Sequence, residues 1–229
     1  MFKAPTSPQG ALKSYAPLSE PELDCIFCPR LADFRSANKV KFPGWYNAPV
    51  QSFGSPDASL LIVGLAPGLK GANRTGRPFT GDYAGVLLYE TLHKFGYSRG
   101  FYDQRPDDGL MLVDCRVTNA VRCVPPANKP LPDEVAACRG FLAGTIREMK
   151  NLRAVLALGR IAFDTMLRTS GLKTSQHKFG HGHAVDLGDG RKLFGSYHCS
   201  RYNTNTGRLT EAMFHRVFED IAGHLKGTA

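Results

Sequence analysis

Four short runs of apolar residues are spaced along the chain, and turn-forming residues bound each of them. The clearest run reads Ser-Leu-Leu-Ile-Val-Gly at residues 59–64. Continuous apolar runs of this length are typical of strands that are buried on both faces, as in a parallel sheet. The predicted strands are 59–64, 110–113, 152–158 and 192–197.

Between these runs, apolar residues recur at helical spacing. Residues 83–95 are the best example, and Asp82 is placed to cap the helix that they predict. The polar segment 171–189 indicates a hairpin with its turn at 188–190. The other predicted helices are 133–150, 159–168 and 209–225, with a short one at 21–34 that Pro29 interrupts.

Alternation of strands and helices predicts a three-layer α/β/α sandwich with a central, mostly parallel four-stranded sheet. Residues 19–229 are expected to form one domain, and the Pro- and Ser-rich residues 1–18 a flexible N-terminal arm. In such sheets, ligands bind outside the carboxyl ends of the strands. The loops that follow residues 64, 113 and 197 are therefore where function is expected.

The composition of the chain favours a globular protein that binds polyanions. The 229 residues are 42% hydrophobic and 21% charged, which supports a globular core. No apolar run approaches the roughly 18–20 residues that span a bilayer, and the N-terminus lacks a secretory pattern, so a soluble intracellular protein is expected. The net charge of +9 favours nucleic acid as a partner, although a merely basic soluble protein fits equally well.

The first loop, residues 64–82, is rich in glycine but contains neither the GxxxxGK[ST] nor the GxGxxG phosphate-binding pattern. Nucleotide cofactors are therefore disfavoured. Phe79 stands in polar, glycine-flanked surroundings, where a flat ligand could stack on it or where the ring could pack into the core. Asp82 is equally compatible with helix capping alone.

The other two loops each carry one candidate for chemistry. Asn119 can offer both a donor and an acceptor to a planar heterocycle, although a turn-forming asparagine is the simpler interpretation. His198, at the carboxyl end of a strand, can act as an acid or a hydrogen-bond donor, although isolated histidines are more often structural. Residues after His198 are polar and basic and include Tyr202, which suits phosphate contacts.

Four of the six cysteines form a candidate metal site. Cys25 and Cys28 make a CxxC motif, and fourteen residues separate Cys123 from Cys138. Four thiolates can bind zinc or an iron–sulfur cluster. Because only one CxxC is present, four unrelated buried thiols remain an alternative.

Together these motifs resemble the iron–sulfur uracil-DNA glycosylases, most closely the family 5 (type b) enzymes of bacteria and archaea. The matching stretches are Gly-Leu-Ala-Pro at 64–67, Asn-Arg-Thr-Gly-Arg-Pro-Phe-Thr-Gly-Asp at 73–82, Thr-Asn-Ala-Val-Arg-Cys at 118–123, and His198 with residues 203–210. Leu65 stands where family 4 enzymes carry an acidic residue, as expected for family 5. The chain departs from many superfamily members at Cys199-Ser200, where they carry Pro-Ser.

The resemblance implies a glycosylase that flips uracil out of DNA and hydrolyses the N-glycosidic bond. Hypoxanthine is an expected further substrate. Since no lysine in these motifs could form a Schiff base, the enzyme is expected to be monofunctional and to leave an abasic site. The implied catalytic residues are Asp82, which would position or deprotonate water, and His198, which would donate to a uracil oxygen. The implied base-binding residues are Leu65, Ala66, Phe79 and Asn119.

Several partners follow from the same resemblance. The implied DNA-binding residues are Arg201, Tyr202, Asn203, Asn205 and Arg208. Arg201, Tyr202 or Leu209 would fill the stack that the flipped base vacates. A structural [4Fe–4S] cluster would be held by Cys25, Cys28, Cys123 and Cys138. The expected partner is double-stranded DNA that contains uracil, and the protein is expected to be a cytoplasmic, nucleoid-associated monomer that contacts no membrane.

Two other functions remain compatible with the residues alone. A four-cysteine zinc protein could bind nucleic acid without catalysis, and its solutions would be colourless rather than brown. An iron–sulfur electron carrier or redox sensor would leave the His198 loop without a purpose.

Overall fold

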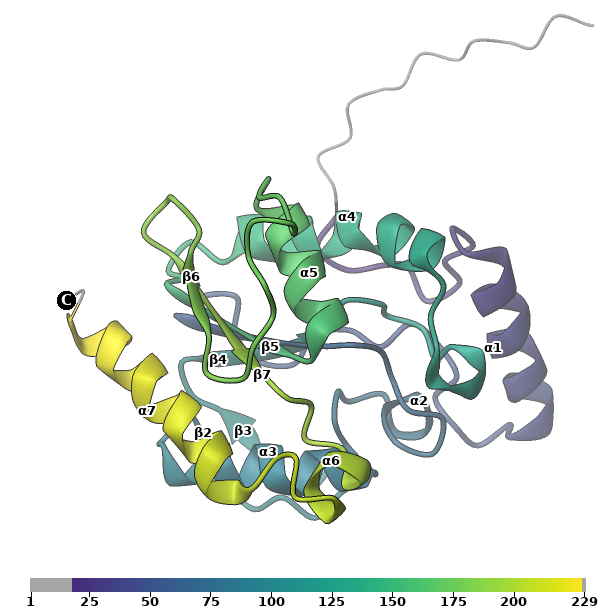
Figure 1. Cartoon of the computed structure of the whole chain (residues 1–229). Helices are drawn as coiled ribbons and strands as arrows, with labels where there is room; N and C mark the ends of the chain where they lie inside the picture. The colour runs from purple at the N-terminus through teal and green to yellow at the C-terminus, as the bar shows by residue number, and fades with distance from the viewer. Residues whose placement is uncertain (1–17, 228–229) are drawn as a thin grey trace, which may run out of the picture.

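A five-stranded sheet lies between two layers of helices, so the predicted three-layer α/β/α sandwich is confirmed (Figure 1). The computed structural model describes residues 18–227, and the predicted arm lies outside them except for Leu18. Strand order is β4-β1-β5-β7-β6, in which only β6 runs antiparallel to its neighbour. The strands are β1 (Leu60–Gly64), β4 (Cys115–Asn119), β5 (Ala154–Leu158), β6 (Ala184–Asp186) and β7 (Lys192–Ser196).

The second predicted strand was misplaced. Residues 110–113 contain only the short β3 (Met111–Leu112), which pairs with β2 (Ser98–Arg99) outside the main sheet. The buried strand is β4, which polar residues disguise in the sequence: Arg116 forms an ion pair with Glu20, and the Thr118 hydroxyl accepts from Ser52. Because long-range partners satisfy these polar groups, hydrophobicity alone did not mark the strand.

A fifth strand enlarges the predicted four-stranded sheet. The expected hairpin at 188–190 is present, and its arms are β6 and β7. Gly188 and Gly190 both adopt positive φ there, at +82° and +84°. A three-residue strand with one buried position is too short to stand out in the sequence.

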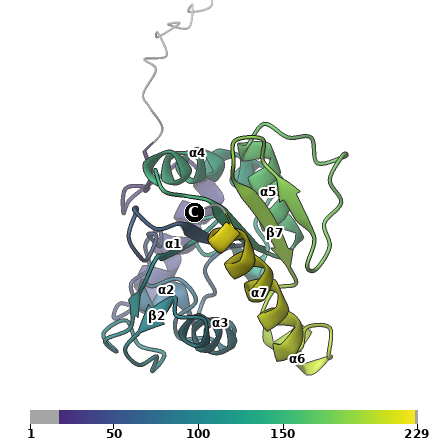
Figure 2. The same cartoon turned by 90° about the vertical axis from the view of Figure 1, so that its left-hand side faces the viewer.

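The major helices cover the sheet in two groups, which both cartoon views separate (Figures 1 and 2). Leu88 on α3 and Phe218 on α7 belong to the core on one face, whereas Leu142 on α4 and Phe163 on α5 belong to the core on the other. These helices are α3 (Tyr83–Lys94), α4 (Pro132–Glu148), α5 (Arg160–Thr169) and α7 (Glu211–Gly227). None of the helices in the described range has the length and apolar character that a bilayer span requires.

The first helix does not lie where the sequence predicted it. Residues 21–28 are irregular, and α1 spans Pro29–Lys41. Proline fits the first turn of a helix, where its missing N–H would have no partner, so Pro29 begins this helix rather than interrupting one. The remaining short elements are α2 (Ala72–Thr75), α6 (Arg201–Asn205) and the 3₁₀ turn Pro126–Asn128.

Candidate active site

Parallel register brings the three predicted loops to one edge of the sheet. Gly64 at the end of β1 lies opposite Asn119 at the end of β4, and β7 ends two residues before His198. The cavity at this edge is lined by Ala66, Pro67, Gly68, Ala72, Phe79, Asp82, Ala84, Asn119 and His198. Five of the six residues predicted for catalysis or base binding therefore lie around one pocket.

Leu65 is the exception among those six. Its side chain is not part of the lining, and its carbonyl accepts a hydrogen bond from the Val121 amide at 3.0 Å. Sequence reasoning did not single out the small residues Pro67, Gly68, Ala72 and Ala84. The run of small residues in the first loop was the available signal, since small side chains leave space for a ligand.

Phe79 belongs to both the core and the pocket. Its ring is 6% exposed and belongs to the core under α3, yet it also lies against the His198 ring, with centroids 5.9 Å apart and planes 27° apart. Gly64 makes room for it, because a Cβ there would come 2.5 Å from Phe79 Cζ. Phe79 therefore packs into the core, as one of the two interpretations predicted, and it also lines the pocket.

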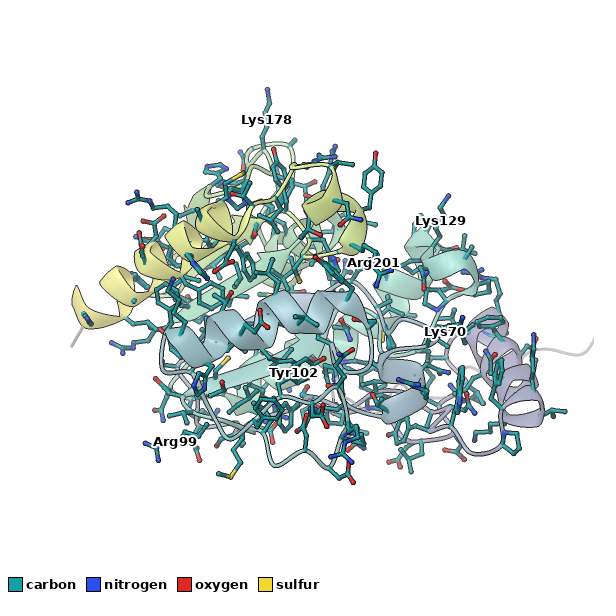
Figure 3. All side chains as sticks on the ribbon, turned by 90° about the horizontal axis from the view of Figure 1, so that it is seen from below. Lys70, Arg99, Tyr102, Lys129, Lys178 and Arg201 are labelled. Atoms are coloured by element: carbon teal, nitrogen blue, oxygen red, sulfur yellow. The ribbon has the colours of Figure 1, made fainter. Side chains whose placement is uncertain are left out.

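The backbone at Phe79 is strained and is held from outside the pocket. Its φ of +53° is unusual for a bulky residue. The Tyr102 hydroxyl donates to the Phe79 carbonyl at 3.0 Å, and the Tyr89 hydroxyl donates to the Pro78 carbonyl at 2.6 Å. Tyr102 lies beside α3 (Figure 3). These two hydrogen bonds hold the backbone that carries the Phe79 ring.

A buried ion pair supports the same loop. Arg77 donates to both carboxylate oxygens of Asp108, at 2.8 and 2.7 Å, and its Nε donates to the Thr80 hydroxyl. Its guanidinium also lies over the Tyr89 and Tyr102 rings. Sequence reasoning missed this support, because its members are far apart in the chain.

Removing the Tyr102 hydroxyl tests this arrangement. In Tyr102→Phe the strained Phe79 carbonyl loses its donor, and we expect the free energy of unfolding to fall by about 1–3 kcal/mol, the usual cost of such an unsatisfied group. Urea unfolding followed by circular dichroism measures it. Tyr83→Phe is the control, because Tyr83 is partly exposed and no hydrogen bond of its hydroxyl is found within residues 18–227. Equal stability of the two variants would contradict the proposed support.

Asp82 presents a carboxylate with an unused acceptor to the pocket. It occupies the N-cap position of α3, and its Oδ1 is buried without a hydrogen-bond partner among the described residues. Burial raises the pKa of this carboxyl, and the amides of Gly85 and Ala84 at the helix start oppose the rise. A buried acceptor of this kind favours an incoming water or substrate donor.

His198 is neutral at physiological pH. Burial lowers the pKa of its imidazole to about 4, so the ring keeps one N–H donor and one acceptor. Asn203 Nδ2 donates to the His198 carbonyl at 2.8 Å, and the Tyr197 amide donates to His181 Nδ1 at 3.2 Å. Both contacts hold the backbone around His198, and sequence reasoning had not singled out His181.

The loop after His198 offers cations and an aromatic ring to solvent. Tyr202 is 72% exposed, and Arg201 lies over the ring of Tyr83 at 5.1 Å. Asn205 and Arg208 are also exposed, whereas the Asn203 amide already holds His198. Leu209 is 1% exposed within the core. It cannot reach DNA, so the expectation that Leu209 fills a vacated stack is wrong.

All four predicted metal ligands line a second cavity, beside α1 and α4. Cys25, Cys28, Cys123 and Cys138 lie there with Leu31 and Phe141. Within residues 18–227, no three His, Cys, Asp or Glu side chains are already arranged around a single ion. Burial raises the pKa of Cys28 to about 11 and of Cys138 to about 12, which describes the free thiols.

Two N–H groups donate to the sulfur atoms of this cavity. The Arg122 amide donates to Cys138 Sγ at 3.3 Å, and Arg35 Nη1 donates to Cys123 Sγ at 3.2 Å. Arg35 is 5% exposed, and its other described partner is the carbonyl of Cys25, which is uncharged. A buried cation without a carboxylate partner suits a negatively charged group held by thiolates.

An aromatic ring, an amide, an imidazole and a carboxylate around one strand-end pocket are groups that can bind a planar heterocycle such as a nucleobase. Residues 51–222 match the family model described as the uracil DNA glycosylase superfamily, and the chain belongs to this superfamily, on its type-5 branch.

Three type-5 relatives align with this protein over most of its chain. It is 46% identical over 198 residues to a type-5 uracil-DNA glycosylase of Thermus thermophilus, with 84% of this chain and 90% of the relative covered. The type-5 uracil-DNA glycosylase of Mycobacterium bovis is 41% identical over 205 residues, covering 86% of this chain and 76% of the relative. That of Pyrobaculum aerophilum is 38% identical over 192 residues, covering 82% and 83%.

Proposed function

We propose that this protein removes uracil from DNA by hydrolysing the bond between the base and its deoxyribose. The observation that carries the proposal is one pocket in which Phe79, Asn119, Asp82 and His198 meet. Base excision needs this combination, because the enzyme must hold a planar base, stabilise it as an anion and activate water. A base in a duplex hides its glycosidic bond, so the nucleotide enters the pocket only after flipping out of the stack.

The roles follow from the chemistry of each group. Phe79 stacks on the uracil face, and the Asn119 amide pairs with its polar edge. As the C1′–N1 bond breaks, electrons pass to the base, and the neutral His198 donates a hydrogen bond to the uracil oxygen that gains charge. The Asp82 carboxylate orients or deprotonates the attacking water, and its charge favours the cationic sugar. Backbone amides at Leu65 and Ala66 add further donors.

We further propose that hypoxanthine is also excised. Leu65 supplies no carboxylate to reject other bases, and alanines rather than large side chains occupy several lining positions. An assay over uracil, hypoxanthine and ethenocytosine in single- and double-stranded oligonucleotides tests which bases the enzyme excises and which form of DNA it prefers. We expect it to prefer duplex DNA. Strand breaks that need hot alkali are expected of a monofunctional enzyme, whereas breaks without alkali would contradict it.

The exposed loop after β7 is proposed to grip the DNA beside the flipped base. Arg201 and Tyr202 are the candidates for the vacated stack, and Asn205 and Arg208 for phosphate contacts, while Asn203 acts through His198.

We also propose that residues 19–229 form one domain. Glu20 supports this, since its carboxylate pairs with the buried Arg122 at 2.8 Å. The enzyme is proposed to work as a monomer in the cytoplasm, on the nucleoid.

We propose that Cys25, Cys28, Cys123 and Cys138 hold a [4Fe–4S] cluster. Their arrangement fits such a group in three respects: four sulfurs line one apolar cavity, two N–H groups donate to sulfur, and the buried Arg35 supplies positive charge. When bound, the cluster supplies a cross-link between α1 and α4 rather than redox chemistry. Arg30 already pairs with Glu134 across the same two helices, at 2.7 Å.

Iron content tests the ligand set. Cys138→Ser removes one thiolate, so we expect the purified variant to lose its brown colour and most of its iron and sulfide. Cys115→Ser is the matched control, because Cys115 is buried outside this cavity and should keep wild-type iron. A colourless wild-type protein that contains one zinc ion per chain would show that the four cysteines hold zinc in place of the cluster. The glycosylase proposal would be unaffected.

A further inference from the structure

A third, larger hollow opens beside the base pocket and carries mostly positive charge. It has a volume of about 830 Å³ and lies between α5, residues 174–179 and the loop after β7. We call it the basic groove, and its lining includes Arg160, Arg168, Lys178, Tyr197, His198 and Arg208. Of these, only His198 and Arg208 were anticipated from the sequence.

The charges of the basic groove are largely uncompensated. Asp164 is the one carboxylate in its lining, and it already pairs with Arg160 at 3.5 Å. Within the described part of the chain, Arg168, Lys178 and Arg208 form no ion pair. Like charges that share a cleft repel one another, so the arrangement costs stability unless a polyanion occupies it, and such a cleft concentrates anions.

Arg208 is held in place within this groove. Its guanidinium lies 4.7 Å from the centre of the Tyr197 ring, and the Tyr197 ring also stacks on His181, with centroids 5.1 Å apart. Tyr197 directly precedes His198. The rigid edge of the groove is therefore the same piece of backbone that positions the imidazole in the base pocket.

His198 lines both hollows, so the basic groove adjoins the base pocket. We propose that the basic groove binds the sugar–phosphate backbone of the strand that carries the flipped nucleotide, with Arg168 and Lys178 as phosphate contacts. This inference rests on the proposed function. It extends the DNA interface from the loop after β7 across α5 to the segment before β6.

The test measures how DNA binding depends on salt. The probe is a duplex with a tetrahydrofuran abasic analogue, which the enzyme cannot cleave, and binding is followed by fluorescence anisotropy between 50 and 200 mM KCl. Each lost phosphate contact reduces the slope of log K against log [salt] by about 0.9 in B-DNA. For the double variant Arg168→Gln/Lys178→Gln we expect the slope to fall by about two such contacts.

Arg99→Gln/Lys150→Gln is the matched control, because it removes the same charge from exposed positions outside the groove. Lys178 and Arg99 project at opposite edges of the molecule in Figure 3. The control slope should equal that of wild type. An unchanged slope in the groove variant, or an equal loss in both variants, would overturn the proposal.

Neutral methylphosphonate linkages identify the strand. Placed beside the abasic analogue on its own strand, they should weaken DNA binding by wild type but not by the groove variant. If only linkages on the complementary strand produced this difference, the assignment to the strand with the flipped nucleotide would be overturned. Absence of excision by wild type, with the salt effect intact, would refute the glycosylase activity and not the groove.

Discussion

Asp82→Asn is expected to slow single-turnover excision of uracil by roughly 10²–10⁴-fold, the usual contribution of a positioned general base. Asparagine keeps the shape of the side chain but cannot take a proton from water or favour a cationic sugar by charge. Rapid-quench assays with enzyme in excess over duplex DNA measure the rate. Asp133→Asn is the control, since it changes an exposed carboxylate at the start of α4. Wild-type rates in Asp82→Asn would remove Asp82 from the mechanism.

The same substitution should stabilise the fold at neutral pH. Because burial raises the pKa of Asp82, folding disfavours its carboxylate, and wild-type stability drops relative to the variant as pH rises through the raised pKa. The difference should therefore be largest at neutral pH and disappear below the unfolded pKa of about 4. Thermal unfolding of both proteins between pH 3 and pH 8 measures it. A variant less stable than wild type at pH 7 would mean that Asp82 serves the fold as a cap.

The pH dependence of the rate follows from the same two groups. The proposed mechanism needs ionised Asp82, so the wild-type rate should fall on the acid side at a pH above the ordinary carboxyl range. His198 is neutral at pH values well above its own pKa of about 4. The acid limb should therefore disappear in Asp82→Asn over pH 4.5 to 9. An acid limb that survives in this variant would assign it to another group.

His198→Ala is expected to slow excision by about 10²–10³-fold, because one well-aimed donor to a developing anion is worth that much. The affinity for product-like abasic DNA should change little, since the hydrogen bond strengthens as the bond to the base breaks. His198→Gln retains an amide donor and should recover part of the loss, which a purely structural role would not predict.

His93→Ala is the matched control for this change, because His93 is exposed at the end of α3 and should excise uracil at the wild-type rate. A His198→Ala enzyme with full activity would contradict the assigned donor. If affinity fell as much as the rate, His198 would act in holding DNA rather than in the chemical step.

Local sequence determined much of this protein. The apolar run of β1, the helical spacing of α3 and α4, and the glycine-rich loop between β1 and α3 are readable because their periodicity and turn chemistry depend on neighbouring residues. The motifs around Phe79, Asn119 and His198 also identified the pocket, since parallel strands place their carboxyl ends together. Spacing and resemblance also singled out the four cysteines that line one cavity.

Tertiary structure decided what depends on partners far apart in the chain. Strand β4 was misplaced because Arg116 and Thr118 look exposed until Glu20 and Ser52 pair with them. The ion pair of Arg77 with Asp108, which supports the Phe79 loop, was likewise not predicted, because its two residues are far apart in the chain. Leu209 directly follows a basic, polar loop in the sequence, yet packing buries it. The basic groove likewise exists only because folding brings α5 and the segment before β6 beside His198, and periodicity carries no information about such contacts.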